Sequence, residues 1–400
     1  PIGNSVSDYW EGLISGKSGS APITYFDTSD FKTKFACELK NFNPLDFIEK
    51  KEIRRQDKFS QYATICSEEA INDSDLINSK FDSNRVGVIW GAGIGGIETF
   101  QNEMENFFSN KKPRFNPFFI PKLIADIAPG LISIKYGFRG PNFATVSACA
   151  SSSNAIIDAL NYIRLGYADV MIAGGSEAAV TCAGIGGFNA MHALSTRNNE
   201  PDKASRPFDN ERDGFVLGEG GGCIVLEDLD HAIKRNAKIY CELAGGGLSA
   251  DAHHMTAPHP EGNGAKKVME NCLQDAKLNI DEVDHINMHG TSTPLGDIAE
   301  TKAVIDVFKK HAYSININST KSMTGHLLGA AGAIEAISCI LSIKNNKIPP
   351  TINHFTNDKQ IDSKLNFTFN KFQERSVRVA LSNTFGFGGH NACLVFKKFD

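Results

Sequence analysis

The chain has 400 residues, of which 41% are hydrophobic and 22% charged, and its formal net charge is −5 at pH 7. This length allows two domains or one duplicated domain, and the composition is that of an ordinary globular protein. The acidic balance argues against nucleic acid as a general partner, and we find no apolar run long enough to span a membrane. Nine cysteines without CxxC pairs favour reduced thiols in the cytoplasm over disulfides or a zinc site.

The first third of the chain is predicted to be helical with one buried strand. Ser7–Leu13 has the pattern of a short helix, and residues 48–71 have that of a longer one. The first turns of the longer run carry basic residues, which are Lys50, Lys51, Arg54 and Arg55. Such a run is usually a solvated helix face.

The strand predicted from Arg85 to Trp90 leads into a glycine-rich segment. Gly91, Gly93 and Gly96 have the spacing of the dinucleotide fingerprint. That fingerprint also needs an acidic residue after the next strand, and a stretch rich in lysine, arginine and proline occupies residues 111–117. The motif is therefore a weak indication of nucleotide binding.

The stretch from Asn142 to Ile157 carries the strongest chemical signal. Its first residues favour a buried strand, and residues 154–163 space their apolar side chains as a helix does, so Cys149 lies at the start of a helix. Free N–H groups and the helix dipole stabilise a thiolate at that position and lower its pKa. An isolated cysteine is more often buried and inert, but the small residues around Cys149 leave room for a substrate, and we predict a nucleophile.

The two halves of the chain show the same order of predicted elements. In the first half, residues 168–177 are a predicted buried strand, and residues 213–229 are a predicted hairpin around glycines. In the second half, strands are predicted at residues 284–288 and 314–318, and residues 378–396 are predicted to form a second glycine-turn hairpin. The repeated order predicts an internal duplication of an α/β unit, with an N-terminal half at residues 1–238 and a C-terminal half at 239–400.

Reactive side chains follow several of these strands. They are Cys149, His289, Lys321 and His326. Loops at the carboxyl ends of strands are where active sites assemble in α/β sheets. A zinc site would need a further ligand at suitable spacing, and a papain-like Cys–His pair would leave the second histidine and the lysine without a role.

The motifs around these residues resemble the β-ketoacyl-acyl-carrier-protein synthases, type II, which are condensing enzymes of the thiolase superfamily. The resemblance covers nearly the whole chain and rests on Ser-Ala-Cys-Ala-Ser, Gly-Gly-Ser-Glu, Ser-Arg-Pro-Phe-Asp, His-Gly-Thr-Ser-Thr-Pro-Leu-Gly-Asp, Lys-Ser-Met-Thr-Gly-His and Asn-Thr-Phe-Gly-Phe-Gly-Gly. It implies a duplicated thiolase-like fold of five αβαβα layers. His390 stands where relatives often have threonine, and the family's opening strand would precede Pro1.

The resemblance also implies a mechanism. Cys149 would accept an acyl chain from acyl carrier protein as a thioester, with the backbone N–H groups of Cys149 and Phe387 as the oxyanion hole. His289 and His326 would donate hydrogen bonds to the malonyl thioester, whose decarboxylation gives the attacking enolate. Lys321 would anchor the His326 loop and keep its imidazole neutral. Glu335 would organise the site from behind.

Binding residues follow from the same resemblance and from charge. Ile94, Phe188 and Phe387 are expected to line an acyl pocket. Thr291 and Thr293 are expected to bind the pantetheine arm, unless they cap the following helix. The basic residues expected to dock the acidic carrier protein are Lys51, Arg54, Arg55 and Arg114.

We expect a homodimer, since Asn142–Ser147 would extend the sheet across a two-fold axis. We expect no cofactor and no catalytic metal. In relatives a structural monovalent cation binds near residues equivalent to Glu335, Asn287, Ser382 and Asn383, and a satisfied polar cluster is the alternative. A polyketide ketosynthase, a non-catalytic chain-length-factor subunit and a nucleotide-dependent oxidoreductase remain alternatives for the whole chain.

Overall fold

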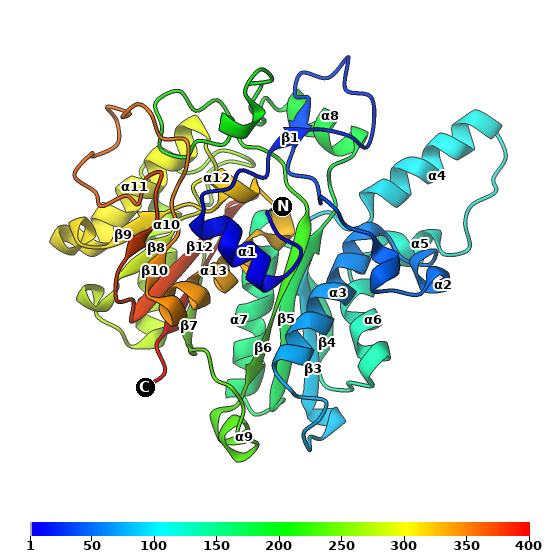
Figure 1. Ribbon diagram of the computed structural model, residues 1–400, viewed down its shortest axis with the longest axis horizontal. Helices are drawn as coiled ribbons and strands as arrows, with labels where there is room; N and C mark the ends of the chain where they lie inside the picture. Colours follow the sequence, from blue (N-terminus) through cyan, green and yellow to red (C-terminus); the bar gives the residue numbers. More distant parts are fainter. Residues whose placement is uncertain (1) are drawn as a thin grey trace.

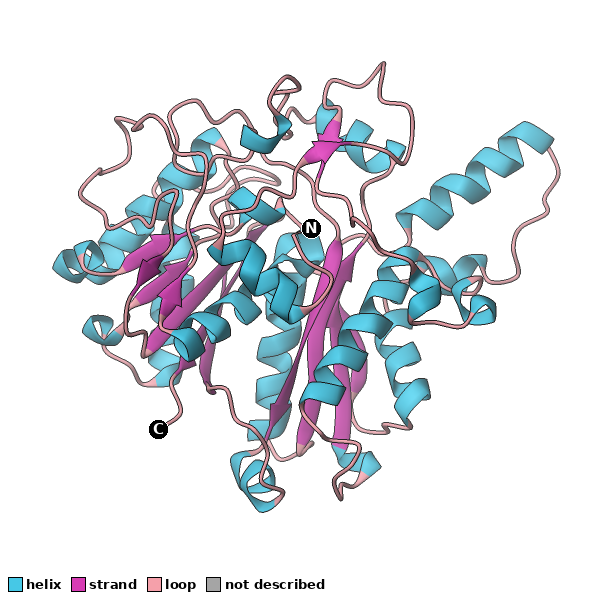
Figure 2. Cartoon of the chain, in the orientation of Figure 1, coloured by secondary structure: helices cyan, strands magenta, loops and turns pink. Residues whose placement is uncertain are grey.

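Two β-sheets stand side by side in the computed structural model, which describes residues 2–400 (Figures 1 and 2). The four-stranded sheet has the order β4-β3-β5-β6, and the five-stranded sheet has the order β7-β13-β12-β8-β9. The strands of the first are β3 (Val86–Gly91), β4 (Asn142–Thr145), β5 (Val170–Glu177) and β6 (Gly220–Glu227). Those of the second are β7 (Glu242–Ala250), β8 (His285–Asn287), β9 (Asn316–Asn318), β12 (Val379–Gly386) and β13 (His390–Lys397).

The two sheets share one topology, which confirms the predicted duplication. In the first sheet β3 is parallel to β4 and β5, and β5 is antiparallel to β6. In the second sheet β8 is parallel to β9 and β12, and β12 is antiparallel to β13. The strand β7 is additional, and among the described residues nothing pairs with β6 in the way that β7 pairs with β13.

Helices complete five layers, as the thiolase-like fold requires. The layer between the sheets contains α7 (Ser151–Arg164) and α13 (Ala331–Asn345), which contact strands of both. The outer face of the first sheet is covered by α3 (Lys58–Asp73) and α6 (Ile127–Tyr136). The outer face of the second is covered by α10 (Asn263–Ala276), with α11 (Pro294–Phe308) packed against α10 (Figure 1).

Shorter elements connect these layers. They are α1 (Val6–Ile14), β1 (Ala21–Pro22), β2 (Phe35–Ala36), α2 (Lys50–Ile53), α4 (Ile97–Asn110), α5 (Phe119–Leu123), α8 (Cys182–Ala190), α9 (Leu229–Lys234), α12 (Lys321–Thr324), β10 (Lys347–Ile348) and β11 (Gln373–Glu374). The helix α4 projects from the body as an arm (Figure 1). The central strands β3 and β5 are buried along their whole length, as expected for parallel strands covered on both faces.

The helix predicted over residues 48–71 is broken in two. The short α2 ends at Ile53, and α3 begins after Asp57, whose carboxylate accepts the N–H of Phe59 at 3.2 Å as an N-cap. The same carboxylate accepts the N–H and hydroxyl of Thr99 at 3.0 and 2.6 Å. The break therefore positions α4 as well as α3, a constraint that helical periodicity does not reveal.

The first predicted hairpin, over residues 213–229, is wrong. Phe215 and Leu217 form only isolated bridges with Leu194 and His326, and β6 pairs with β5 instead. The glycines serve close packing and not a turn, since a Cβ on Gly222 would lie 3.1–3.2 Å from side chains of α13. The second predicted hairpin is confirmed as β12 and β13.

One apolar stretch, Leu328–Asn345, is long and hydrophobic enough to cross a membrane, which corrects the expectation that no such run exists. The fold buries 78% of this stretch, because it contains the central helix α13. Length and composition alone do not separate such a core helix from a membrane span.

Candidate active site

Cys149 lies in a tight turn, Ala148–Ala150, between β4 and α7, and only 6% of its surface is exposed. Ala148 has φ of 50°, in the left-handed region that is costly for a residue with a Cβ. The hydroxyl of Ser151 accepts the N–H of Ser147 at 2.9 Å and donates to the carbonyl of Ala148 at 2.7 Å. This bonding holds the turn in its strained form and fixes the direction of the sulfur.

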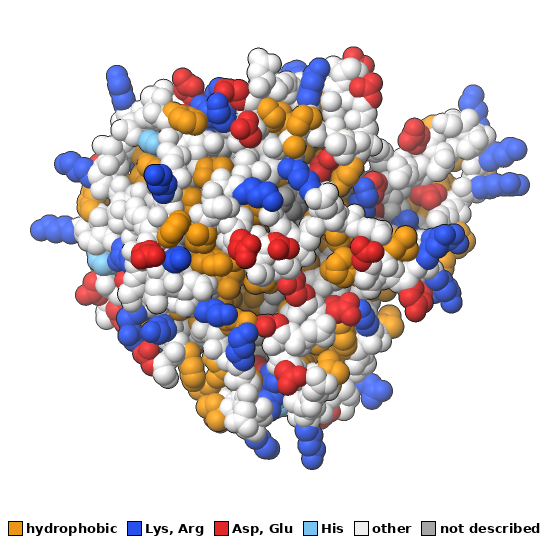
Figure 3. All heavy atoms as spheres, viewed as in Figure 1, with side chains coloured by type: hydrophobic (Ala, Val, Ile, Leu, Met, Phe, Trp, Pro, Cys, Tyr) orange, Lys and Arg blue, Asp and Glu red, His pale blue; other side chains and the backbone are white. Residues whose placement is uncertain are grey.

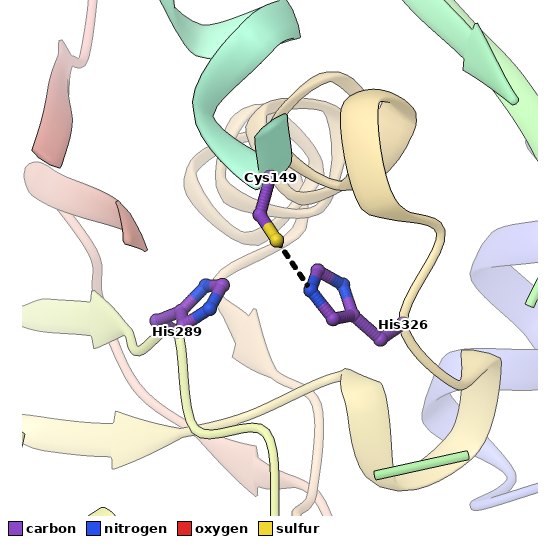
Figure 4. Close-up of side chains that lie close together, drawn as sticks. All are labelled: Cys149, His289 and His326. Atoms are coloured by element: carbon purple, nitrogen blue, oxygen red, sulfur yellow. Dashed lines mark hydrogen bonds between the residues drawn. The ribbon is translucent and has the colours of Figure 1, made fainter. Parts of the chain in front are cut away.

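Both predicted histidines lie near the sulfur, and only His326 contacts it. His289 follows β8, and His326 follows β9 and α12, so the duplicated topology places both near the end of β4. The Nε2 atom of His326 lies 3.0 Å from Sγ of Cys149, and the two imidazole centroids are 5.3 Å apart with the rings nearly perpendicular (Figure 4). The turn, strand and helix ends thus bring three distant residues into one constellation.

Both imidazoles are neutral. Burial lowers the pKa of His326 well below its usual range, and the charge of Lys321 lowers it further. Burial, the charge of Lys321 and the neighbouring His326 act on the pKa of His289 in the same direction. A neutral imidazole carries one N–H donor and one free nitrogen, so each ring can donate a hydrogen bond or accept a proton.

The lowered pKa expected for Cys149 is not observed. Burial raises the pKa of its thiol to about 12, and the charge of Lys321 and the N–H of Phe387 offset only part of that effect. The helix α7 begins at Ser151, two residues beyond the sulfur-bearing residue. At rest Cys149 is therefore a thiol, and Nε2 of His326 lies within hydrogen-bond distance of its sulfur.

Phe387 lies in the turn between β12 and β13, and its N–H points at the sulfur of Cys149. This turn passes very close to the nucleophile, since a Cβ on Gly386 would lie 2.7 Å from the carbonyl oxygen of Ser147 and 3.1 Å from the nitrogen of Cys149. Only glycine permits that approach. The N–H groups of Cys149 and Phe387 consequently face the same atom.

Lys321 is almost fully buried and donates to the carboxylate of Glu335 on α13. The pair fixes the ammonium near both imidazoles, which explains its effect on their pKa values. The second oxygen of Glu335, and the side-chain oxygens of Asn287 and Asn383, are buried without a hydrogen-bond partner among the described residues. Unpartnered hard oxygen atoms of this kind suit an alkali or alkaline-earth cation better than a satisfied polar cluster.

Two buried carboxylates near the site receive no role from the sequence, although one of them, Glu177, ends the Gly-Gly-Ser-Glu motif. Glu300 on α11 accepts the N–H groups of His289 and Gly290 at 2.8 and 2.9 Å, and burial raises its pKa to about 7. Glu177 ends the wholly buried strand β5 and accepts backbone N–H groups from other segments. An acidic residue at the end of an apolar strand was the available signal, because a buried carboxylate must be bonded.

The glycine segment that matched the dinucleotide fingerprint binds Glu177. The N–H groups of Gly93, Ile94 and Gly95 donate to its carboxylate at 2.7, 3.2 and 3.2 Å. In a dinucleotide site these groups would face a phosphate. They are therefore engaged within the protein, which argues against the oxidoreductase alternative.

The residues expected to line the acyl pocket differ in how they lie relative to the apolar cluster around Cys149. Phe188 packs in the same apolar cluster as Cys149, and its ring meets that of Phe215 at 5.3 Å. Phe387 is half-buried in its turn. The side chain of Ile94 is 41% exposed and lies outside this cluster.

Thr291 and Thr293 lie in the loop after His289. Their hydroxyls are 3.0 Å apart and bond each other. Thr293 occupies the N-cap position of α11 but makes no side-chain capping bond. The capping alternative therefore has no support, and both hydroxyls lie beside the site.

The predicted docking residues lie around α2 and beneath the α4 arm. Lys51, Arg54 and Arg114 are exposed, and Arg55 pairs with Glu52 while its guanidinium lies 5.2 Å from the ring centre of Phe118. Lysine and arginine side chains stand out on that side of the molecule (Figure 3).

An apolar cavity of about 850 Å³ lies between β6, α3 and α13. Its lining includes none of the three converging residues. We place the active site at Cys149 because chemistry needs convergent reactive groups and not volume alone.

The same three side chains have their donor atoms within 4.8 Å of one another, which is compact enough for a metal ion. Metal-bound histidines nearly always donate their other nitrogen to an acceptor. The Nδ1 atoms of His289 and His326 have no such partner among the described residues. The constellation thus fits nucleophilic chemistry better than metal binding.

A buried thiol facing two neutral imidazoles at the junction of two duplicated α/β halves defines a thiolase-like enzyme. The chain belongs to the beta-ketoacyl synthase family: the family's N-terminal domain matches residues 1–232 and its C-terminal domain matches residues 240–355.

Individual relatives of the chain are consistent with this family. The 3-oxoacyl-[acyl-carrier-protein] synthase 2 of Synechocystis sp. is 46% identical over 399 residues, covering 100% of this chain and 95% of the relative. A solved structure described as the ishigamide ketosynthase/chain length factor has a TM-score of 0.92 at 32% identity, covering 100% and 96%. A type II polyketide ketosynthase solved in complex with its acyl-carrier protein has a TM-score of 0.88 at 31% identity, covering 100% and 97%.

Proposed function

We propose that the protein is a 3-oxoacyl-acyl-carrier-protein synthase, an acyltransferase that elongates fatty acids by decarboxylative Claisen condensation. The observation that carries this proposal is the 3.0 Å contact between Nε2 of His326 and Sγ of Cys149, with the neutral ring of His289 beside it. The identity to 3-oxoacyl-acyl-carrier-protein synthase 2 over the whole chain supports it.

The first step is acyl transfer. The Cys149 sulfur attacks the thioester carbonyl of acyl carrier protein as its proton passes to Nε2 of His326. The carbon–sulfur bond to the carrier breaks, and the proton moves from His326 to the departing pantetheine sulfur. The N–H groups of Cys149 and Phe387 hold the intermediate oxyanion, and each such donor contributes about 10²–10³ in rate.

The second step generates the nucleophile. A malonyl thioester binds with its carbonyl oxygen between His289 and His326, and each neutral ring donates one N–H to it. For His326 the ring hydrogen must first move from Nδ1 to Nε2, because Nε2 passed the proton of Cys149 to the pantetheine sulfur. The bond to the carboxylate breaks, carbon dioxide leaves, and its electron pair forms an enolate whose charge the two donors stabilise. The enolate carbon then attacks the acyl-Cys149 carbonyl, the bond from that carbon to the Cys149 sulfur breaks, and the thiolate takes from solvent the one proton that the overall reaction consumes.

Lys321 and Glu335 support these steps without contacting substrate. Burial keeps both imidazoles neutral and the ammonium of Lys321 adds to that effect, so that each ring can donate a hydrogen bond without being a strong acid. Glu335 holds that ammonium in place. Thr291 and Thr293 would bind the pantetheine arm with their hydroxyls, and Phe188 would face the acyl chain; a lining role for Ile94 stays a prediction.

Acyl carrier protein is the partner. The solved relative bound to its carrier protein supports this assignment, and so does the exposed basic surface formed by Lys51, Arg54, Arg55 and Arg114. Carrier proteins are acidic, so complementary charge guides their encounter with the enzyme.

The protein would form a homodimer in the cytoplasm. The edge strand β4 has no neighbour on its outer side among the described residues, and Val146 beyond it is 63% exposed. Pairing with a second copy would cover that edge. All nine cysteines are free thiols, which suits a reducing compartment.

No cofactor is proposed beyond a structural cation. Glu335, Asn287 and Asn383 would hold it through their unpartnered oxygens, and its role would be to neutralise charge behind the site. The thermal midpoint should rise when a bulky organic cation in the buffer is replaced by potassium.

One experiment tests the main proposal and its alternatives. The purified protein is incubated with acyl and malonyl carrier proteins, and the products are weighed by mass spectrometry. A single two-carbon elongation supports the proposal, and repeated elongation without reduction indicates a polyketide ketosynthase. No condensation with an intact Cys149 indicates a chain-length-factor-like subunit.

A further inference from the structure

Glu177 is a fully buried carboxylate that the condensation mechanism does not use. It ends β5 and is 0% exposed. Its Oε2 atom accepts the N–H groups of Gly93 at 2.7 Å and Gly329 at 3.1 Å, and Oε1 accepts those of Ile94 and Gly95, both at 3.2 Å. The carboxylate is thus bound by four backbone donors from two separate segments.

These donors connect the nucleophile with its base. Gly329 lies three residues after His326, in the turn Leu328–Ala330. A Cβ on Gly93 would lie 2.7 Å from Oε2 of Glu177, 3.2 Å from the nitrogen of Gly329 and 3.3 Å from the carbonyl oxygen of Ala148. The glycine segment, the Cys149 turn and the turn after His326 therefore meet at this carboxylate.

Only a carboxylate suits four donors. It offers about four lone-pair sites on two oxygens, whereas an amide would turn an NH₂ group toward two of the N–H groups. Burial raises the pKa of Glu177 to about 7, and the four N–H bonds act in the opposite direction. The negative charge also acts on the nucleophile, since it raises the pKa of Cys149.

We propose that Glu177 is a positioning residue for condensation: its carboxylate locks the turn after His326 and the glycine segment against the Cys149 turn, so that Nε2 stays in contact with the sulfur. This inference rests on the proposed function. A second consequence is electrostatic, because the ionised carboxylate disfavours a free thiolate and leaves proton transfer to His326.

The test compares Glu177→Gln with Glu177→Asp. The glutamine variant keeps the shape but loses the charge and two of the four bonds, and the aspartate variant keeps the charge but is one methylene shorter. Glu219→Gln is the matched control, because Glu219 is also buried and accepts hydrogen bonds from Tyr25 and Leu39. Each variant is assayed for condensation and for Cys149 alkylation by iodoacetamide at pH 8.

For Glu177→Gln we expect kcat to fall at least about tenfold with little change in carrier KM, while alkylation becomes several-fold faster. For Glu177→Asp we expect kcat to fall but alkylation to stay near the wild-type rate. Glu219→Gln should change neither. Loosened packing alone would also expose the buried thiol and speed its alkylation. Glu177→Asp controls for this effect, because it disturbs the same contacts but keeps the charge; equally fast alkylation in both variants would remove the electrostatic consequence.

Unchanged kcat in Glu177→Gln, with only a lower thermal midpoint, would overturn the inference. If that variant does not fold, Glu177→Asp decides, because an unchanged kcat in this variant, whose side chain is one methylene shorter, would overturn the inference equally. A wild-type protein that fails to condense refutes the proposed function instead. Alkylation remains measurable in that case, and an unchanged rate in Glu177→Gln would then overturn the inference on its own.

Discussion

Replacing His289 and His326 by alanine, one at a time, separates the two half-reactions of the proposed mechanism. The rings are neighbours of similar burial, but only His326 contacts the sulfur of Cys149. With a thiol pKa of about 12, only about one thiol in 10⁵ is ionised at pH 7, so acyl transfer depends on a base. The two variants should therefore differ in acyl transfer.

For His326→Ala we expect the rate of Cys149 acylation to fall about 10²–10⁴-fold, the usual contribution of a general base. For His289→Ala that rate should fall by less than about tenfold, since its ring serves the malonyl carbonyl. Decarboxylation should fall about 10²–10³-fold in either variant, because each removes one donor to the same oxyanion. The double variant should lose little more than either single one.

The assay follows acyl-enzyme formation by intact-protein mass spectrometry and carbon dioxide release from carboxyl-labelled malonyl carrier protein. Cys149→Ala is the reference, which should abolish condensation but still release carbon dioxide. Equal acylation rates in the two histidine variants would remove His326 as the base. Normal decarboxylation in either histidine variant would refute the proposal that both rings donate to the same oxyanion.

Three further predictions address single interactions. Alkylation of Cys149 should accelerate about tenfold per pH unit from pH 6 to 9, because a thiol with a raised pKa has no plateau there; a plateau near neutral pH would show a low pKa. Lys321→Met should lower the free energy of unfolding by about 3–5 kcal/mol in chemical denaturation, by leaving Glu335 buried and unpaired. Adding Glu335→Gln should restore part of that loss, and purely additive losses would contradict the pairing. Arg54→Glu should raise the carrier KM several-fold and weaken its salt dependence, whereas the exposed Lys310→Glu should not; equal effects would remove the docking surface.

The converging residues could be predicted from the sequence because the signal is local and the topology is regular. Each of Cys149, His289 and His326 follows a strand, and parallel strands of one sheet end at one edge. The duplication then places the edges of both halves together. None of these steps needs knowledge of side-chain packing.

The features that could not be predicted depend on contacts between distant segments. The pKa of Cys149 follows from burial by residues such as Phe215 and Leu328, so the local position at a helix start gave the wrong direction. The break at Asp57 depends on its bonds to Thr99, 42 residues away. The periodicity of the sequence gives no information on either of these contacts.

Burial is the main reason that Cys149, His289 and His326 are neutral at rest, and the buried charges around them adjust their pKa values. Lys321 lowers the pKa of the thiol and of both imidazoles, whereas Glu177 raises that of the thiol. An imidazolium at either position would give the enolate an acidic proton beside its carbon, and protonation there would waste the malonyl unit. Neutral imidazoles stabilise the enolate through hydrogen bonds and are poor proton donors to carbon. Burial and the charge of Lys321, which keep both imidazoles neutral, therefore favour condensation over unproductive decarboxylation.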